Sequence, residues 1–448
     1  MIDRRSIIAG AAALAAAPML AGKALAAPAQ KQSSLGSASF PSGFLWGAAT
    51  AGHQIEGNNT NSDQWLLENV QPTITGAPSG DAVNSLELWR DDLDLVKSIG
   101  LNGFRFSLEW PRIEPEPGMF SCAMLDHYKA IIDGCRERGI APVVSFNHYT
   151  TPRWFAAQGG WLHPDASDLF TRFCERAAKH LASGIAIATT LNEPNLPRLL
   201  PFVLPPQFMG GLRANLAAAA KAAGVPRYLV ANTVLPEDVP ALTAAMIKGH
   251  KSARAAIKAV RPDLPVGFTL SIADDQPVGP NSIRDRMRAE LYGDWLAVAR
   301  DDDFVAIQNY ERILWGKDGR LPAPAGTPRN FRGAEVYAPS LAGAARYAYQ
   351  ATGKPVLVTE HGVGTDDDTI RANLIRDGLR ELLGAMAEGV PVQGYIHWTL
   401  MDNYEWGAGI GHGAFGLASV DPVTFKRSPK PSAQVLKAIA QSNSISPI

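Results

Sequence analysis

The stretch Ala188-Thr-Thr-Leu-Asn-Glu-Pro-Asn195 ends an apolar, β-branched run that begins at Ile185. Pro194 has no backbone N–H and fixes its own φ, so a strand must stop here and hold Glu193 at its C-terminal end. A second run, Pro355-Val-Leu-Val-Thr-Glu360, also ends in a glutamate. Because the carboxyl ends of parallel barrel strands meet at one rim, the sequence predicts that both glutamates project from the same rim.

Runs with strand character alternate with runs of helical periodicity from Phe40 onward, without a change in composition. The expected strands are Phe44–Ala51, Gly103–Ser107, Ala141–Asn147, Ile185–Leu191, Val266–Ser271, Phe304–Gln308, Pro355–Thr359 and Gln393–Thr399. The expected helices are Leu86–Ile99, Leu125–Arg138, Ala166–Ala182, Val239–Val260, Ser282–Ala299, Leu341–Ala351, Ile370–Ala387 and Ala433–Ala440. This α/β pattern predicts one domain over residues 40–448, a (β/α)₈ TIM barrel with long βα loops.

A doubly wound α/β sheet is the alternative for such alternation. No Gly-x-Gly-x-x-Gly follows the first expected strand, and polar residues gather at strand ends all along the chain. Both observations favour the barrel, because barrel enzymes collect their functional residues on the C-terminal rim.

Residues 1–27 have the pattern of an export signal. Arg4-Arg5 precede an Ala- and Leu-rich run that ends at Leu20, and Ala24-Leu25-Ala26 supplies small residues for cleavage. The paired arginines resemble a twin-arginine leader. The run is shorter than the ~20 residues that span a bilayer, which disfavours a membrane anchor. We therefore expect export to a bacterial periplasm or secretion, a linker over residues 28–39, and no membrane contact after the signal is removed.

The composition of the 448-residue chain bounds its partners. Hydrophobic residues make up 46% and charged residues 19% of the chain, and the net charge is −1 with no long run of either sign. Nucleic acid and acidic lipid are unsupported as partners, whereas a small neutral substrate suits such a surface. Cys122, Cys135 and Cys174 are too few for a disulfide framework and lack metal-ligand spacing,. We expect buried cysteines, no metal and no cofactor, and the oligomeric state stays open.

Two glutamates on one rim suit the hydrolysis of a glycosidic bond. That reaction needs a carboxylic acid to protonate the leaving oxygen and a carboxylate to act on the anomeric carbon. The alternative for either glutamate alone is an ordinary rim residue or a helix cap. Arg105 lies inside an expected barrel strand, where a charge is costly unless it is paired, and Glu360 is its natural partner.

Other strand ends carry the groups that a sugar site needs. Hydroxyls require fixed donors and acceptors, and the apolar face of a pyranose packs on an aromatic ring. Suitable amide, imidazole, carboxylate and aromatic groups occur at Gln54, His148, Asn309-Tyr310, Trp398, Glu405 and Trp406. Each of these residues alone could be a cap or a packing residue. For His53 and Cys122 we expect only such a structural role. Together with Arg105 on the strand Gly103–Ser107, the groups suited to a sugar make five strands with polar or aromatic groups at one rim, which favours a binding site.

These motifs resemble the glycoside hydrolase family 1 β-glycosidases from Phe40 to about Lys430. The resemblance is carried, in order, by Phe40-Pro-Ser-Gly-Phe-Leu-Trp-Gly-Ala-Ala-Thr50, Gln54-Ile-Glu-Gly57, Phe104-Arg-Phe-Ser107, Thr190-Leu-Asn-Glu-Pro194, Asn309-Tyr310, Thr359-Glu360 and Leu400-Met-Asp-Asn-Tyr-Glu-Trp406. It implies a retaining, exo-acting, β-glucosidase-like enzyme that works by double displacement through a covalent glycosyl-enzyme.

The resemblance also implies a role for each matching residue. Glu193 resembles the acid/base and Glu360 the nucleophile. Arg105 and Tyr310 resemble the residues that orient the nucleophile, and Asn192 the residue that binds the sugar 2-hydroxyl. The remaining positions implied to bind the sugar are Gln54, His148, Asn309, Trp398 as the stacking platform, Glu405, Trp406 and Phe415.

The chain departs from the family pattern at several positions. His361 follows the nucleophile where asparagine is usual, and Asn195 stands where many members carry an aromatic residue. The segment Gly407–Phe415 lacks the lysine of phospho-sugar members, and Glu405 would repel a 6-phosphate, which favours an uncharged sugar,. Arg198–Pro236 is also unlike the common forms.

Two alternative functions remain at this stage. One is a glycosyl-transferring enzyme of the same fold, because water and a sugar acceptor compete for the same intermediate. The other is a sugar-binding homologue without turnover, which the presence of both glutamates disfavours. The sugar epimer, the linkage and the aglycone stay open.

Overall fold

Eight parallel strands form a closed barrel in the order β10-β11-β2-β3-β4-β5-β6-β8. The computed structural model describes residues 38–204 and 207–445, so the predicted export signal lies outside the described residues. The barrel strands are β2 Leu45–Ala49, β3 Gly103–Ser107, β4 Ala141–Ser145, β5 Ile187–Asn192, β6 Val266–Ser271, β8 Val305–Asn309, β10 Val356–His361 and β11 Val392–Trp398. The predicted (β/α)₈ barrel is confirmed, and each strand end lies within two residues of its predicted position.

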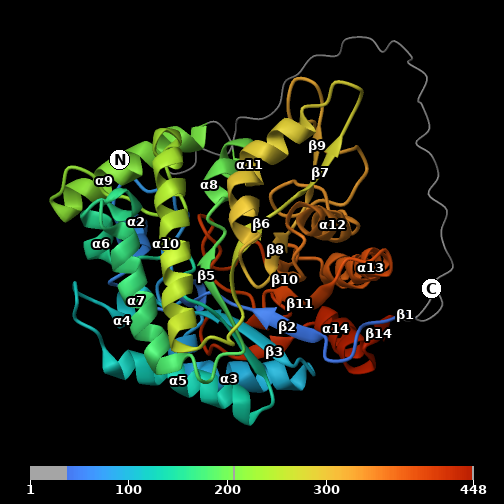
Figure 1. Ribbon diagram of the computed structural model, residues 1–448, viewed down its shortest axis with the longest axis horizontal. Coiled ribbons are helices and arrows are strands. Elements are labelled where there is room, and N and C mark those ends of the chain that lie inside the picture. Colours follow the sequence, from blue (N-terminus) through green and yellow to red (C-terminus); the bar gives the residue numbers. More distant parts are fainter. Residues whose placement is uncertain (1–37, 205–206, 446–448) are drawn as a thin grey trace. The chain divides into compact units, whose positions relative to one another are not determined.

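Helices surround the barrel strands (Figure 1). Those that match the predicted helices are α3 Ser85–Ser98, α5 Cys122–Glu137, α7 Ala166–Leu181, α10 Val239–Val260, α11 Arg284–Ala299, α12 Ser340–Thr352, α13 Asp368–Ala387 and α14 Pro431–Ser442. In α7 the buried residues Phe170, Phe173, Cys174 and Ala177 recur every three or four positions. This spacing gives the helix one apolar stripe, which is what fixes its inner face.

Further elements, most of them short, lie within the βα loops and were not predicted. They are α1 Gly52–Ile55, α2 Asp63–Asn69, α4 Trp110–Ile113, α6 Arg153–Ala157, η1 Gly160–Leu162, α8 Leu196–Val203, α9 Gln207–Ala223, η2 Pro236–Asp238, β7 Asp274–Pro277, β9 Arg312–Trp315, β12 Ala418–Val420 and β13 Arg427–Pro429. Most are too short to show a clear hydrophobic period in sequence. Because they follow barrel strands, they build up the walls at the C-terminal rim.

The chain ends that the structure describes are paired with each other. Strand β1, Ala38–Ser39, pairs antiparallel with β14, Ser444–Ile445. Ala38 and Ser39, the last two residues of the predicted linker, therefore belong to the folded unit. None of the helices within residues 38–204 and 207–445 is both long and apolar enough to cross a bilayer.

The expectation of three buried cysteines is wrong for one of them. Cys135 and Cys174 are buried, but Cys122 is exposed. Cys122 is the first residue of α5 and precedes the buried stripe, which begins at Leu125. A small apolar residue at a helix start is therefore not held inside by the periodicity of the helix.

Replacing Trp110 should measurably destabilise the fold. Trp110 is fully buried, and its ring packs against Phe155 and Phe173, with centroids 4.8 and 5.1 Å away. Trp110→Ala should lower the free energy of unfolding by about 3–5 kcal/mol. Urea unfolding followed by circular dichroism measures this change. Met119→Ala, at a side chain that is 67% exposed, is the control and should change it by less than about 0.5 kcal/mol; equal effects would contradict this placement of Trp110.

Candidate active site

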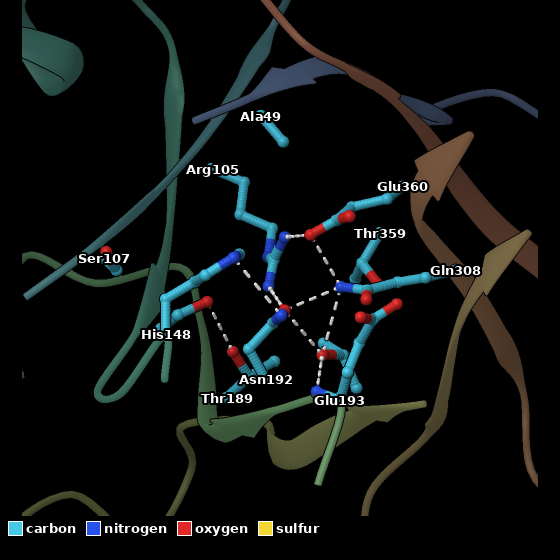
Figure 2. A network of polar contacts seen from close by, with 12 residues as sticks. Ala49, Arg105, Ser107, His148, Thr189, Asn192, Glu193, Gln308, Thr359 and Glu360 are labelled. Atoms are coloured by element: carbon cyan, nitrogen blue, oxygen red, sulfur yellow. Dashed lines mark hydrogen bonds and ion pairs between the residues drawn. The ribbon is translucent and has the colours of Figure 1, made fainter. Parts of the chain in front are cut away.

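A buried arginine lies at the centre of the polar groups at the C-terminal end of the barrel (Figure 2). Arg105 of β3 donates from Nη1 to Glu360 Oε1 at 2.5 Å and from Nη2 to Asn192 Oδ1 at 2.5 Å. The side chain has no exposed surface. The ion pair expected from the sequence is present, and it offsets the cost of burying the guanidinium.

Gln308 of β8 joins the same network and was not predicted. Its Nε2 lies 2.8 Å from Glu360 Oε1, 2.7 Å from Asn192 Oδ1 and 3.1 Å from Thr269 Oγ1. An amide inside a buried strand is the same kind of signal that identified Arg105. The side chain links the ends of β5, β6, β8 and β10, so it holds the carboxylate of Glu360 in place (Figure 2).

Glu360 is buried at the end of β10 and accepts hydrogen bonds on both oxygens. Arg105 and Gln308 donate to Oε1, and the hydroxyl of Tyr310 donates to Oε2 at 2.5 Å. Burial raises the pKa of Glu360, while the charge of Arg105 and the hydrogen bond from Tyr310 lower it. Of the two glutamates, Glu360 is therefore the one held as a carboxylate.

Glu193 is held at the end of β5 by a left-handed backbone with φ of 43°. Its N–H donates to Thr269 O at 3.0 Å, and Oε2 accepts a hydrogen bond from the hydroxyl of Tyr149. Burial, followed by the negative charge of Glu360, raises the pKa of Glu193 to about 8. A left-handed glutamate costs about 1–3 kcal/mol, a type of strain that concentrates at functional sites. Burial and the neighbouring negative charge therefore favour the protonated form of Glu193.

Both glutamates line a cavity of about 870 Å³. The predicted site residues that line it are His148, Glu193, Tyr310, Glu360, Trp398, Glu405, Trp406 and Phe415. The rings of Trp398 and His148 are stacked 5.7 Å apart. Trp406 stacks on His53 at 5.3 Å, and His53 bonds Glu68 at 2.9 Å. The structural interpretation of His53 is confirmed, because this side chain supports Trp406 from behind.

Four predicted residues lie behind the cavity wall: Arg105, Asn192, Gln54 and Asn309. Gln54 donates to Tyr404 O at 2.6 Å. Asn309 donates to Ile272 O at 2.9 Å and accepts from Ser340 Oγ at 2.7 Å. Neighbouring side chains point to opposite faces of a strand, so Gln308 faces into the barrel and Asn309 faces α12. Asn309 therefore supports a loop, in place of the predicted sugar contact.

Arg332 enters the site from the long loop after β9. It lines the cavity, and its Nη2 donates to Glu405 Oε1 at 2.7 Å. Burial raises the pKa of Glu405 to about 7, and the charge of Arg332 opposes this. Nothing in the local sequence pattern identified Arg332, because its contact depends on the path of a loop.

The two departures from the family motifs have structural explanations. His361 lies 3.0 Å by Nδ1 from the hydroxyl of Tyr395, and burial lowers its pKa to about 3, so it is neutral. Asn195 donates to Ser271 O at 2.8 Å and accepts from Ser271 N at 3.1 Å. Asn195 thus joins the ends of β5 and β6 and presents no ring to a ligand.

Residues 36–311 and 339–445 match the model of Glycosyl hydrolase family 1. The chain belongs to this family. It is 29% identical to a β-glucosidase of Agrobacterium sp., covering 90% of this chain and 95% of that one. It is 27% identical to β-glucosidase A of Thermotoga maritima, covering 91% and 98%. This chain is accordingly a glycoside hydrolase, a retaining β-glycosidase with a glycoside substrate.

Solved structures agree with this family assignment. The crystal structure of β-glycosidase BGL167 has a TM-score of 0.85 and 44% identity, over 91% of this chain and 98% of that chain. The apo structure of a β-glucosidase 1317 has a TM-score of 0.86 and 38% identity, over 89% and 98%. Phe331 and Arg332 of the cavity fall between the two matched segments of the family model.

The pH profile should report the protonation of Glu193. We expect kcat/KM for an alkyl β-glucoside, whose poor leaving group needs a proton, to fall as the pH rises through about 8, if Glu193 supplies that proton. The hydrogen bond from Tyr149 favours the ionised form of Glu193. Tyr149→Phe should therefore move this alkaline limb to higher pH.

Steady-state kinetics from about pH 4 to pH 10 measure both limbs of this profile. Tyr349→Phe, on the outer helix α12, is the matched control and should leave both limbs unchanged. An alkaline limb that moves to lower pH in Tyr149→Phe would contradict the assignment.

Proposed function

We propose that this β-glycosidase removes uncharged β-D-glycosyl residues, glucose above all, from the non-reducing end of its substrates. Glu193 is the acid/base and Glu360 the nucleophile. The single observation that supports this division is the placement of Arg105. It pairs with Glu360, whereas the carboxyl of Glu193 is hydrogen-bonded by the neutral side chains of Tyr149 and Ser271.

Each step conserves atoms and charge. A carboxylate oxygen of Glu360 bonds to the anomeric carbon as the bond from that carbon to the leaving oxygen breaks. Glu193 gives its proton to that oxygen, so the aglycone departs as a neutral alcohol. Glu193, now a carboxylate, takes a proton from water; the water oxygen bonds to the anomeric carbon and displaces Glu360. Two inversions give a sugar with retained configuration.

The hydrogen bond that Glu193 accepts from Tyr149 indicates which carboxyl oxygen of Glu193 carries the proton for the leaving group. Oε2 accepts from Tyr149, and burial keeps the pKa of that tyrosine well above 10. Tyr149 therefore remains a donor, and the acidic proton belongs on Oε1 of Glu193. We assign the sugar to the part of the cavity lined by His148, Trp398 and Glu405. The relatives named as β-glucosidases support glucose as the preferred sugar.

Azide rescue separates the two glutamates. Glu360→Ala should abolish turnover of aryl glucosides, and azide should restore it with inverted configuration. Glu193→Ala should keep the first step with a good leaving group but slow the second, which gives a burst. Azide needs no base, so it should rescue this variant with retained configuration. Product configuration by NMR is the measurement.

Glu116→Ala, at an exposed glutamate outside the cavity, is the control and should behave as the parent enzyme. If azide gave the retained product with Glu360→Ala and the inverted product with Glu193→Ala, Glu360 would be the acid/base and Glu193 the nucleophile. Full activity in both site variants would place the chemistry elsewhere.

We further propose that the protein is exported, on the support of Arg4-Arg5 and the apolar run that follows. The full chain expressed in a bacterium with a twin-arginine pathway should give activity in the periplasmic fraction. Arg4→Lys with Arg5→Lys should keep the activity in the cytoplasm. Arg286→Lys, at an exposed position, is the control and should still be exported. Export of the double variant at the level of the parent protein would contradict the proposal.

A further inference from the structure

The cavity is aliphatic on the side where the leaving group must lie. An acid has to reach the leaving oxygen, so the aglycone occupies the side of the sugar nearer to Glu193. Helix α8 begins directly after the Glu193-Pro194-Asn195 turn and supplies Leu196, Leu199 and Leu200 to the cavity wall. The first turns after the acid are therefore a hydrocarbon surface.

Other elements continue this apolar surface. Phe208 of α9, Leu67 of α2 and Ile74 line the cavity, as do Ile272 and Ile313 from the loops after β6 and β8. Behind this wall, leucines and alanines of α9 form a separate hydrophobic cluster with Leu66 and Leu67 of α2. The wall therefore rests on a packed layer of its own, which holds it in position.

A second sugar would find poor partners on this side. A pyranose needs several fixed donors and acceptors and an aromatic face for its C–H bonds. Asn195 presents no aromatic ring, and its amide is bonded to the backbone of Ser271. We assign Trp398 and Trp406, the tryptophans among the described lining residues, to the sugar end, and Phe208 is an aromatic ring on the aglycone side. Polar side chains also line the cavity, but the charged ones near this wall are already paired: Glu311 with Arg320 at 3.1 Å and Arg332 with Glu405 at 2.7 Å. The uncharged side chains include Gln64, Asn232 and Thr233.

We propose that the enzyme acts on β-glycosides of bulky, mostly aliphatic alcohols, rather than on disaccharides or oligosaccharides. The proposal rests on the proposed function and names the leaving group for that site. A cavity of about 870 Å³ has room for an aglycone of several rings beside one sugar, since pockets of about 300–1,000 Å³ enclose whole drug-sized ligands. Displacing water from leucine and isoleucine side chains supplies the binding energy for such an aglycone.

The test compares leaving groups on one sugar. Initial rates give kcat/KM for methyl, octyl and bornyl β-D-glucoside and for cellobiose. The alkyl alcohols are similar in acidity, so their ratios report binding of the aglycone in the transition state. We expect bornyl and octyl glucoside to exceed methyl glucoside by about tenfold or more, equivalent to about 1.4 kcal/mol, and to exceed cellobiose.

Two variants test the wall itself. Leu200→Asn and Phe208→Asn should each reduce the bornyl-to-methyl ratio of kcat/KM by about fivefold or more, because each places an amide against the aglycone. Val423→Asn is the control, since the side chain of Val423 is 82% exposed and does not line the cavity. It should leave the ratio and the activity as they are.

The outcomes separate this proposal from the one it rests on. Turnover of 4-nitrophenyl β-D-glucoside together with a preference for cellobiose over both large alkyl glucosides overturns the aglycone assignment alone. A bornyl-to-methyl ratio of kcat/KM that stays unchanged in both Leu200→Asn and Phe208→Asn also overturns the aglycone assignment alone. Absence of turnover with every β-glycoside, the aryl compound included, overturns the proposed function and with it this inference.

Discussion

The buried charge of Arg105 is the constraint on which the rest of the site depends. A guanidinium inside a barrel costs several kcal/mol unless it is paired and hydrogen-bonded. Glu360 accepts a hydrogen bond from Nη1 and Asn192 from Nη2, and the same two acceptor oxygens also accept from Gln308 and Thr269, respectively. These residues come from β3, β5, β6, β8 and β10. One network therefore ties five strand ends together and fixes the carboxylate that the chemistry needs.

The same arginine makes two chemically identical side chains behave differently. Burial raises the pKa of both Glu193 and Glu360. Arg105 opposes this at Glu360 through direct contact, and the resulting negative charge raises the pKa of Glu193 further. An acid beside a carboxylate is what a retaining glycosidase requires at the start of its cycle. The division of roles that we propose thus follows from which carboxyl the cation touches.

Sequence patterns predicted the barrel because its strands are short apolar runs bounded by glycine, proline and polar residues. They predicted Arg105 because a charge in such a run needs a partner. They missed Gln308 and misplaced Asn309, although strand alternation distinguishes the two side chains. Tyr149 and Arg332 could not be found this way. Their contacts depend on a left-handed backbone at Tyr149 and on the path of a long loop, and no local periodicity encodes either.

The turn after β5 links the proposed acid to the wall that we assign to the aglycone. Glu193 ends the strand in a left-handed conformation, Asn195 fixes the turn to β6, and the chain then enters α8. The acid and the aliphatic wall are therefore one continuous segment, whereas Trp398, Glu405 and Trp406, which we assign to the sugar, come from β11 and the loop after it. Because the two ends of the cavity come from different strands, the residues of α8 and α9 can change without moving the network around Arg105. The leaving group can then be selected independently of the sugar.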